Sequence, residues 1–224
     1  MNKIYVLFVV ISGLALAPAC KKEKKTDHKK RVKVQMNPLD NTENKWKGAI
    51  SRDDFAKIQE LAEAHPELIN IPHDRYSALG KALTHKKHDL ALYLIDHGAE
   101  IDYSCTPYND TPLMVAAKYG DLDIVEKLLD KDANVNYGNI NGETALMQAA
   151  LGCHSEIVDK LITADAHVDA IDKHGENAYE KSRRASLRPR PDHPGRLVRH
   201  PGCLAICKKL KDLGVSTMPP ALPH

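Results

Sequence analysis

The sequence predicts an all-α solenoid of about five helix-turn-helix repeats joined by β-turn hairpin loops. Two nearly identical heptads, TPLMVAA at residues 111–117 and TALMQAA at residues 144–150, lie 33 residues apart. Self-similarity at a fixed period of this length is the signature of a repeat architecture. Aromatic residues make up only 5% of the chain, and alanine and leucine are frequent. This composition favours helices packed through small side chains over a β-sandwich.

Each repeat opens on a small polar residue that can accept hydrogen bonds from the amides at the start of a helix. The five such positions are Asn44, Ser77, Thr111, Thr144 and Asn177. Small or apolar residues, mostly alanines, follow five and six positions later. A second apolar segment begins thirteen positions later, such as LALYLI from Leu90 and IVEKLL from Ile124. We therefore expect first helices that pack closely through alanine, and second helices that bury an aliphatic stripe against the next repeat.

The turns between these helices carry residues that tolerate a positive φ angle. Glycine adopts this conformation without steric cost, and Asn and Asp are the next best residues. The positions expected to need it are Gly98, Asp132 and Asp165 after second helices, and Asn109, Gly142 and Gly175 in the connecting turns.

The last repeat departs from the period. Its second apolar segment, which starts at Ile206, arrives 16 residues late. The intervening insertion, about residues 187–202, is rich in Arg, Pro and His and includes Arg188, Arg190, Arg196 and Arg199. Long insertions in compact folds are either functional or disordered. Both interpretations remain open, and the four arginines form a candidate surface.

The repeat resembles the ankyrin repeat, which has about 33 residues and a T-P-L-H-x-A opening. Thr111-Pro112-Leu113 and Thr144-Ala145-Leu146 match that opening, whereas Met114 and Met147 stand at the histidine position of the family. The resemblance covers roughly residues 44–217. It implies repeats near 44–76, 77–110, 111–143, 144–176 and 177–217, with a tail at 218–224, and binding through a concave face of first helices and turn tips.

The first 19 residues have the pattern of a signal peptide. Lys3 precedes an apolar stretch of 14 residues, from Ile4 to Ala17, which is shorter than the roughly 20 residues that cross a bilayer. The segment LALAPAC resembles the lipobox of bacterial lipoproteins, which implies that Cys20 is the lipid anchor. An ordinary signal peptide cut after Ala19 is the alternative.

Residues 20–43 are expected to form a basic disordered tether. Eight Lys or Arg lie between Lys21 and Lys33, without any apolar periodicity. The tether is either a solvated spacer or an arm that lies on anionic lipid. Lys21 stands where enteric lipoproteins of the inner membrane have Asp, so the resemblance implies an outer-membrane protein that faces the periplasm.

The sequence contains no phosphate-binding glycine loop, nucleophile elbow or HExxH motif. We therefore expect no enzymatic activity, no cofactor and no resident metal. One alternative stays open, a metal-binding or enzymatic role for the insertion. His193, His200, Cys203 and Cys207 offer nitrogen and sulfur ligands there, in a spacing that matches no common zinc site. His85 and His88 are assigned to a solvated turn.

Disulfides persist in exported proteins. Cys153 and Cys203 align at the turns of adjacent repeats, which leaves open whether they pair.

Without catalytic motifs, the expected site is a surface that binds a protein. The net charge of +2 argues against a general polyanion binder, so we expect no nucleic-acid partner. Because catalytic motifs are lacking, we also expect no small-molecule substrate. The candidate contacts are Tyr76, Lys81, His85, Tyr108, Val115, Lys118, Tyr119, Gln148 and Leu151, among which Val115, Tyr119 and Leu151 would form an exposed apolar strip. Tyr103 and Tyr137 are assigned to covering the hairpins. The expected partner is a protein of the cell envelope, either an enzyme that the chain scaffolds or a toxin that it neutralises.

Overall fold

A computed structural model of the protein describes residues 38–72, 76–187 and 200–215. These residues contain ten α-helices, one short 3-10 helix and no β-strand, which confirms the predicted all-α fold. The first three helix pairs are α1 (Pro38–Arg52) with α2 (Phe55–Ala64), α3 (Ala78–Thr84) with α4 (His88–Asp96), and α5 (Pro112–Tyr119) with α6 (Leu122–Asp130). The last two are α7 (Ala145–Gly152) with α8 (Ser155–Thr163), and α9 (Ala178–Ser186) with α10 (Pro201–Asp212). The 3-10 helix η1 spans Pro66–Asn70.

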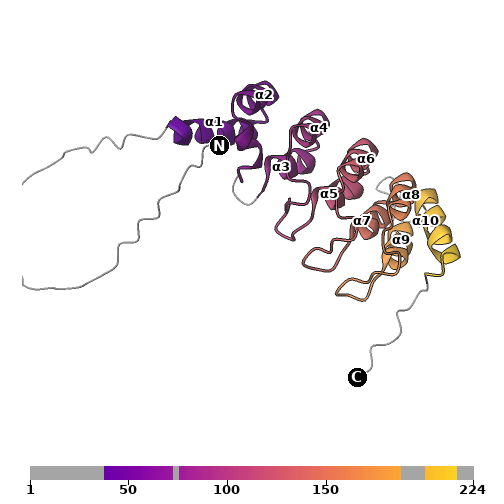
Figure 1. The fold of residues 1–224 in the computed structure, drawn as a ribbon. Coiled ribbons are helices and arrows are strands. Elements are labelled where there is room, and N and C mark those ends of the chain that lie inside the picture. The colour runs from indigo at the N-terminus through magenta and orange to yellow at the C-terminus, as the bar shows by residue number, and fades with distance from the viewer. Residues whose placement is uncertain (1–37, 73–75, 188–199, 216–224) are drawn as a thin grey trace, which may run out of the picture. The chain divides into compact units, whose positions relative to one another are not determined.

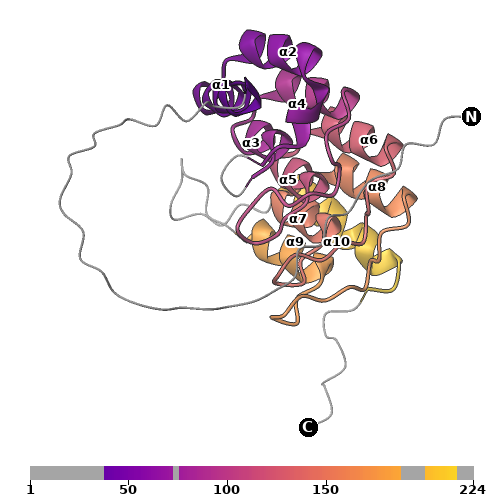
Figure 2. The same cartoon turned by 60° about the vertical axis from the view of Figure 1, so that its left-hand side comes forward.

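The helix pairs follow one another in chain order (Figure 1). First helices pack on first helices, through the contacts α3–α5, α5–α7 and α7–α9. Second helices pack on second helices, through α4–α6, α6–α8 and α8–α10. Figure 2 shows the same order of pairs from a view turned by 60°. Each pair therefore buries its apolar face against its neighbours, as a repeat protein must.

Four of the five predicted helix caps are confirmed. The side-chain oxygens of Ser77, Thr111, Thr144 and Asn177 accept hydrogen bonds from the amide three residues later, at 2.9–3.4 Å. Each bond satisfies an amide that has no partner inside the helix.

The prediction for Asn44 is wrong, because this residue lies inside α1. Trp46, Ala49 and Ile50 are all buried, so the second half of α1 packs one face of the helix into the core. The polar first half extends the helix upstream to Pro38. Residues 38–43, which were expected to belong to the disordered tether, are therefore helical. The rest of the expected tether lies outside the described residues, as do the signal segment and Cys20.

The core has the predicted composition. First helices bury alanines such as Ala116 and Ala149, and second helices bury aliphatic residues such as Ile124 and Leu128. The first helices approach the hairpin loops closely as well. A Cβ atom on Gly80 would lie 2.8 Å from both Cα and Sγ of the buried Cys105.

All six predicted positive φ angles are confirmed. They are Gly98 (89°), Asn109 (58°), Asp132 (60°), Gly142 (75°), Asp165 (63°) and Gly175 (74°). Side chains in these loops then join one repeat to the next. Asn70 bonds the backbone of Gly98 and Glu100, Asp102 accepts from the amide of Asn134, and Asn136 bonds Asp165 and His167.

The last repeat keeps its helix pair despite the insertion. α10 starts at Pro201, so the insertion ends slightly earlier than residue 202. Cys153 and Cys203 form a disulfide with their Cα atoms 4.5 Å apart, which resolves the pairing that the sequence left open. Arg188, Arg190, Arg196, Arg199 and His193 lie outside the described residues. Within the described helices, none combines the length and apolar character that a membrane span requires.

Candidate functional site

The predicted partner surface has a buried middle. Residues four positions after each cap are Lys81, Val115, Gln148 and Lys181. Val115 is only 3% exposed and Gln148 only 6% exposed, so the prediction that they lie on the surface is wrong. The expected apolar strip of Val115, Tyr119 and Leu151 does not form. Lys81 remains half-buried at the edge of this row.

Hairpin side chains explain why the middle of the surface is covered. Glu143, in the hairpin before α7, accepts a hydrogen bond from Nε2 of Gln148 at 3.1 Å. The ammonium group of Lys181 reaches back to Glu143 at 2.7 Å and to Asp172 at 2.6 Å. The loops thus lie over the first turns of the helices, and a sequence alignment of helix positions alone does not reveal this cover.

The buried cluster around Lys181 has perturbed acidities. Burial acts to raise the pKa of Asp172, but the ion pair with Lys181 and the amides of Glu176 and His174 outweigh it. The pKa of Asp172 therefore lies below its ordinary value. The pKa of Glu143 is also lowered, since Lys181 and Asn139 outweigh its burial. These carboxylates are ionised at neutral pH and hold the last hairpins against α9.

Residues nearer the helix C-termini do reach solvent. The positions seven after each cap are Thr84, Lys118, Leu151 and Arg184, and the next positions include His85 and Tyr119. We call these six residues the helix-end row. Lys118, Arg184, His85 and Tyr119 are exposed, whereas Thr84 and Leu151 are half-buried. Predicted contacts at His85, Lys118, Tyr119 and Leu151 therefore remain accessible.

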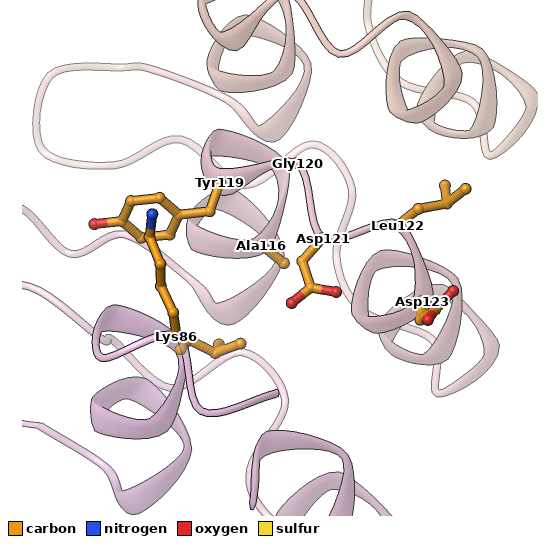
Figure 3. A pocket seen from close by; sticks show the side chains of 8 residues that line it. Lys86, Ala116, Tyr119, Gly120, Asp121, Leu122 and Asp123 are labelled. Atoms are coloured by element: carbon orange, nitrogen blue, oxygen red, sulfur yellow. The ribbon is translucent and has the colours of Figure 1, made fainter. Parts of the chain in front are cut away.

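An open cleft of about 360 Å³ lies beside this row, between the turns of the second and third repeats. Figure 3 shows Lys86 extending over the ring of Tyr119. Asp121 and Asp123 lie to the right of this pair in the view. Nζ of Lys86 is 5.1 Å from the ring centroid, within range of a cation–π contact. Lys86 was not among the contacts predicted from the sequence, because only the fold places it against Tyr119 of the neighbouring repeat.

Two smaller clefts occupy the equivalent turns. One of about 300 Å³ is lined by Asp53, Phe55 and His88, and one of about 200 Å³ by Leu122 and His154. The repeat period thus recurs as a row of clefts along the turns between first and second helices.

The histidines of the THKKHD turn do not face one another. Nδ1 of His85 lies 3.3 Å from Asp53 in the preceding repeat, and Nδ1 of His88 lies 3.0 Å from Asp121 in the following repeat. The bond to Asp121 raises the pKa of His88, against the opposing effect of burial. These residues therefore bridge successive turns.

Large apolar side chains are exposed on three successive hairpin loops. Tyr108 is 56% exposed, Ile140 and Ile171 are each 45% exposed, and Tyr103 and Tyr137 are 39% and 38% exposed. We call these five residues the hairpin surface. Tyr103 and Tyr137 were expected to cover the hairpins, but more than a third of each residue is exposed to solvent. Ile140 and Ile171 were missed, although an isoleucine in a polar turn is a signal that the sequence does contain.

The backbone of the hairpins is held firmly. The side-chain oxygen of Asn139 accepts from the amides of Asn141 and Glu143. Asp172 accepts in the same way from His174 and Glu176. The amide of Ile140 donates to the carbonyl oxygen of Tyr108 at 2.9 Å, which joins two hairpins. The exposed tyrosines and isoleucines therefore lie on preorganised loops. Tyr76, another predicted contact, is half-buried at the start of the second repeat.

The cysteine and histidine set also differs from the predicted one. In the described part of the chain, the group placed like metal ligands is Cys153, His200 and Cys203. Cys207 is free, and its Sγ lies 3.5 Å from Oγ of Ser182 instead.

Stacked helix pairs with exposed apolar side chains on their hairpins, and no strand in the described residues, define a helical repeat protein. A family model for ankyrin repeats, in three copies, matches residues 48–139 and 116–181. The chain therefore belongs to the ankyrin-repeat family. No curated protein matches it. Ankyrin repeats are protein–protein interaction modules and are typically non-enzymatic.

Proposed function

We propose that the chain is a membrane-tethered module that captures a protein partner in the bacterial cell envelope. The observation that carries the binding role is the hairpin surface, where five large apolar side chains are exposed on three successive loops. Tyrosine is favoured at binding hot spots because it offers a large, stiff and amphipathic contact. The hairpins are already ordered by their own hydrogen bonds, so binding there loses little conformational entropy.

The helix-end row supplies the second part of the contact. Tyr119 offers an aromatic ring, while Lys118 and the neighbouring Lys86 add positive charge. The expected partner therefore presents apolar side chains to the hairpin surface and acidic groups to the helix-end row.

The envelope location is proposed from the sequence. The segment LALAPAC places Cys20 directly after a small residue, as in bacterial lipoproteins, and the basic segment from Lys21 follows it. In that setting the chain serves as a scaffold for an envelope enzyme or as an immunity protein that neutralises a toxin. Both uses need the same surface, and the identity of the partner separates them.

Capture of the partner from bacterial membranes tests the binding role. The bait is the full chain, compared with a Tyr108→Ser/Ile140→Ser variant and a Tyr119→Ala/Leu151→Ala variant. Leu213→Ser is the matched control, because Leu213 is 50% exposed but follows α10, outside both surfaces. We expect the first two variants to lose the partner and the control to keep it. A partner retained by both surface variants contradicts the proposal.

Fractionation tests the tether separately. We expect the full chain in the membrane fraction and a Cys20→Ala variant in the soluble fraction, since a lipid anchor needs the thiol. A Cys20→Ala variant that stays in the membrane fraction excludes the lipid anchor. That result would not change the outcome of the binding test, because the binding test probes the hairpin surface and the helix-end row.

A further inference from the structure

The turn after α7 and the first turn of α10 bring together three side chains with sulfur and nitrogen donors. The ligand atoms of Cys153, His200 and Cys203 all lie within 4.8 Å of one another. The two cysteines are joined as a disulfide. An imidazole therefore lies beside the two sulfur atoms without taking part in the bond between them.

Backbone contacts hold these residues in place without relying on the disulfide. Cys153 ends α7 in the left-handed conformation, with φ at 63°, where Gly120 ends α5 in the preceding repeat. α10 begins directly against this turn, because a Cβ on Gly202 would lie 2.6 Å from the carbonyl oxygen of Cys153. Oγ of Ser182 donates to the carbonyl oxygen of Cys203 at 2.8 Å. We therefore expect both sulfur atoms to stay near each other when the bond between them is broken.

The donor set suits a soft divalent cation. Thiolate sulfur and neutral imidazole nitrogen are the ligands that zinc takes in proteins. In a tetrahedral site, zinc–sulfur and zinc–nitrogen bonds of about 2.3 and 2.1 Å put the sulfur and nitrogen atoms about 3.6 Å apart. The separations here reach 4.8 Å at most. His200 is exposed, so a rotation of its side chain can bring the ring nitrogen about 1 Å closer to the sulfur atoms.

The group of three residues is open to solvent on one side. Cys203 is fully buried, Cys153 is half-buried and His200 is exposed. A cation can enter from the His200 side, and water can complete the fourth position of a tetrahedral site. The cation also compensates the thiolate charge that would otherwise be costly at the buried Cys203.

We propose that Cys153, Cys203 and His200 bind a zinc-class cation once the disulfide is reduced. The disulfide and the cation are then alternative links between α10 and the turn after α7. This ligand set keeps His200 and Cys203 of the predicted group, has Cys153 in place of Cys207, and does not include His193, which lies outside the described residues. It revises the expectation that the chain holds no metal.

The reduction step balances with a phosphine as the reductant. The S–S bond breaks, phosphorus supplies two electrons, and water gives its oxygen to the phosphine oxide and its two protons to the thiols. Cation binding then forms two metal–sulfur bonds and one metal–nitrogen bond, and the two thiol protons pass to the solvent.

Cobalt(II) is the probe, because thiolate ligation gives it a charge-transfer absorption. The full chain is reduced with a phosphine under nitrogen, freed of reductant and titrated with Co²⁺. We expect one cobalt ion per chain with thiolate charge-transfer absorption, which Zn²⁺ then displaces, and no such band in the oxidised chain. A reduced chain without the band overturns the proposal.

Matched variants test the ligands. We expect Cys153→Ser to abolish the band and His200→Ala to weaken cobalt binding by at least about tenfold. A Cys20→Ser/Cys207→Ser variant and a His174→Ala variant should bind cobalt as the parent chain does. Survival of the band in Cys153→Ser, or unchanged affinity in His200→Ala, overturns the assignment. His200 is exposed, so its variant keeps the test decisive even where a cysteine variant loses its fold in circular dichroism.

Discussion

Nζ of Lys181 in α9 lies 2.7 Å from Oε1 of Glu143, which belongs to the hairpin of the preceding repeat. The same ammonium group lies 2.6 Å from Oδ2 of Asp172 in its own hairpin. The side chains of Lys181 and Asp172 are 4% and 0% exposed. One buried cation thus links two successive hairpins to the helix beneath them, and these hairpins support part of the hairpin surface.

Removing this cation should destabilise the fold strongly. In Lys181→Met, Asp172 stays buried and Glu143 stays half-buried without their counter-charge, and we expect a loss of about 3 kcal/mol in the free energy of unfolding. Urea unfolding followed by circular dichroism measures it. Lys209→Met is the control, since it breaks a largely solvent-exposed ion pair with Asp159 and should cost less than about 1 kcal/mol. Equal losses in the two variants would contradict the importance of the buried cluster.

The same cluster predicts how stability depends on acid. The pKa values of Asp172 and Glu143 lie below their ordinary values of 3.8 and 4.5. A carboxylate with a lowered folded pKa stabilises the fold fully above its unfolded pKa and loses this contribution as pH falls through the folded pKa. We therefore expect the free energy of unfolding to decrease from about pH 5 to about pH 3.

Lys181→Met is also the test of this pH dependence. Without the ammonium group, the two carboxylates lose the main interaction that lowers their pKa values, so the decrease over the same pH window should shrink. Urea unfolding at several pH values gives both curves. Parallel curves for the parent chain and the variant would assign the acid sensitivity to other groups.

Gly80 is expected to tolerate no side chain. The Cβ of alanine would lie 2.8 Å from Cα of Cys105, which is backbone and cannot move aside cheaply. We expect Gly80→Ala to cost about 1–3 kcal/mol in thermal or urea unfolding. Gly48→Ala, in α1, is the matched control. Its Cβ would meet only the flexible guanidinium of Arg52, 3.2 Å away, so alanine should be neutral or slightly stabilising there.

Local patterns in the sequence were enough to predict the fold. The period of the caps located Ser77, Thr111 and Thr144, because each cap bond joins residues only three positions apart. The positive φ angles followed in the same way from the conformational preferences of glycine, asparagine and aspartate. Asn44 misled the prediction because a capping residue says nothing about whether an earlier residue has already started the helix.

The surface was harder to predict, because it depends on contacts between repeats. The helix positions of Val115 and Gln148 predict exposure, but both residues are buried in the folded chain, where Gln148 donates to Glu143 of the hairpin before α7. Lys86 gains its partner Tyr119 only through stacking. The pairing of Cys153 with Cys203 likewise needs the fold, which brings α10 back to its place after an insertion that interrupts the period.

His88 offers a direct test of how successive turns are linked. Its Nδ1 lies 3.0 Å from Oδ1 of Asp121, and its Nε2 lies 3.8 Å from Oδ2 of Asp123. Asp121 precedes α6 but makes no side-chain capping bond, so its carboxylate faces His88 instead. The bond to Asp121, with smaller contributions from Asp123 and Asp89, raises the pKa of His88 above 6.5.

A raised histidine pKa stabilises the fold fully below 6.5, and this contribution is lost as pH rises through the folded pKa. We expect NMR titration of the His88 ring to show a midpoint above 6.5 in the parent chain, and a lower midpoint in Asp121→Asn, which keeps the size of the side chain but removes its charge. Asp123→Asn should lower the midpoint less, because its oxygen is farther away. A midpoint that Asp121→Asn leaves unchanged would show that this pair does not link the second repeat to the third.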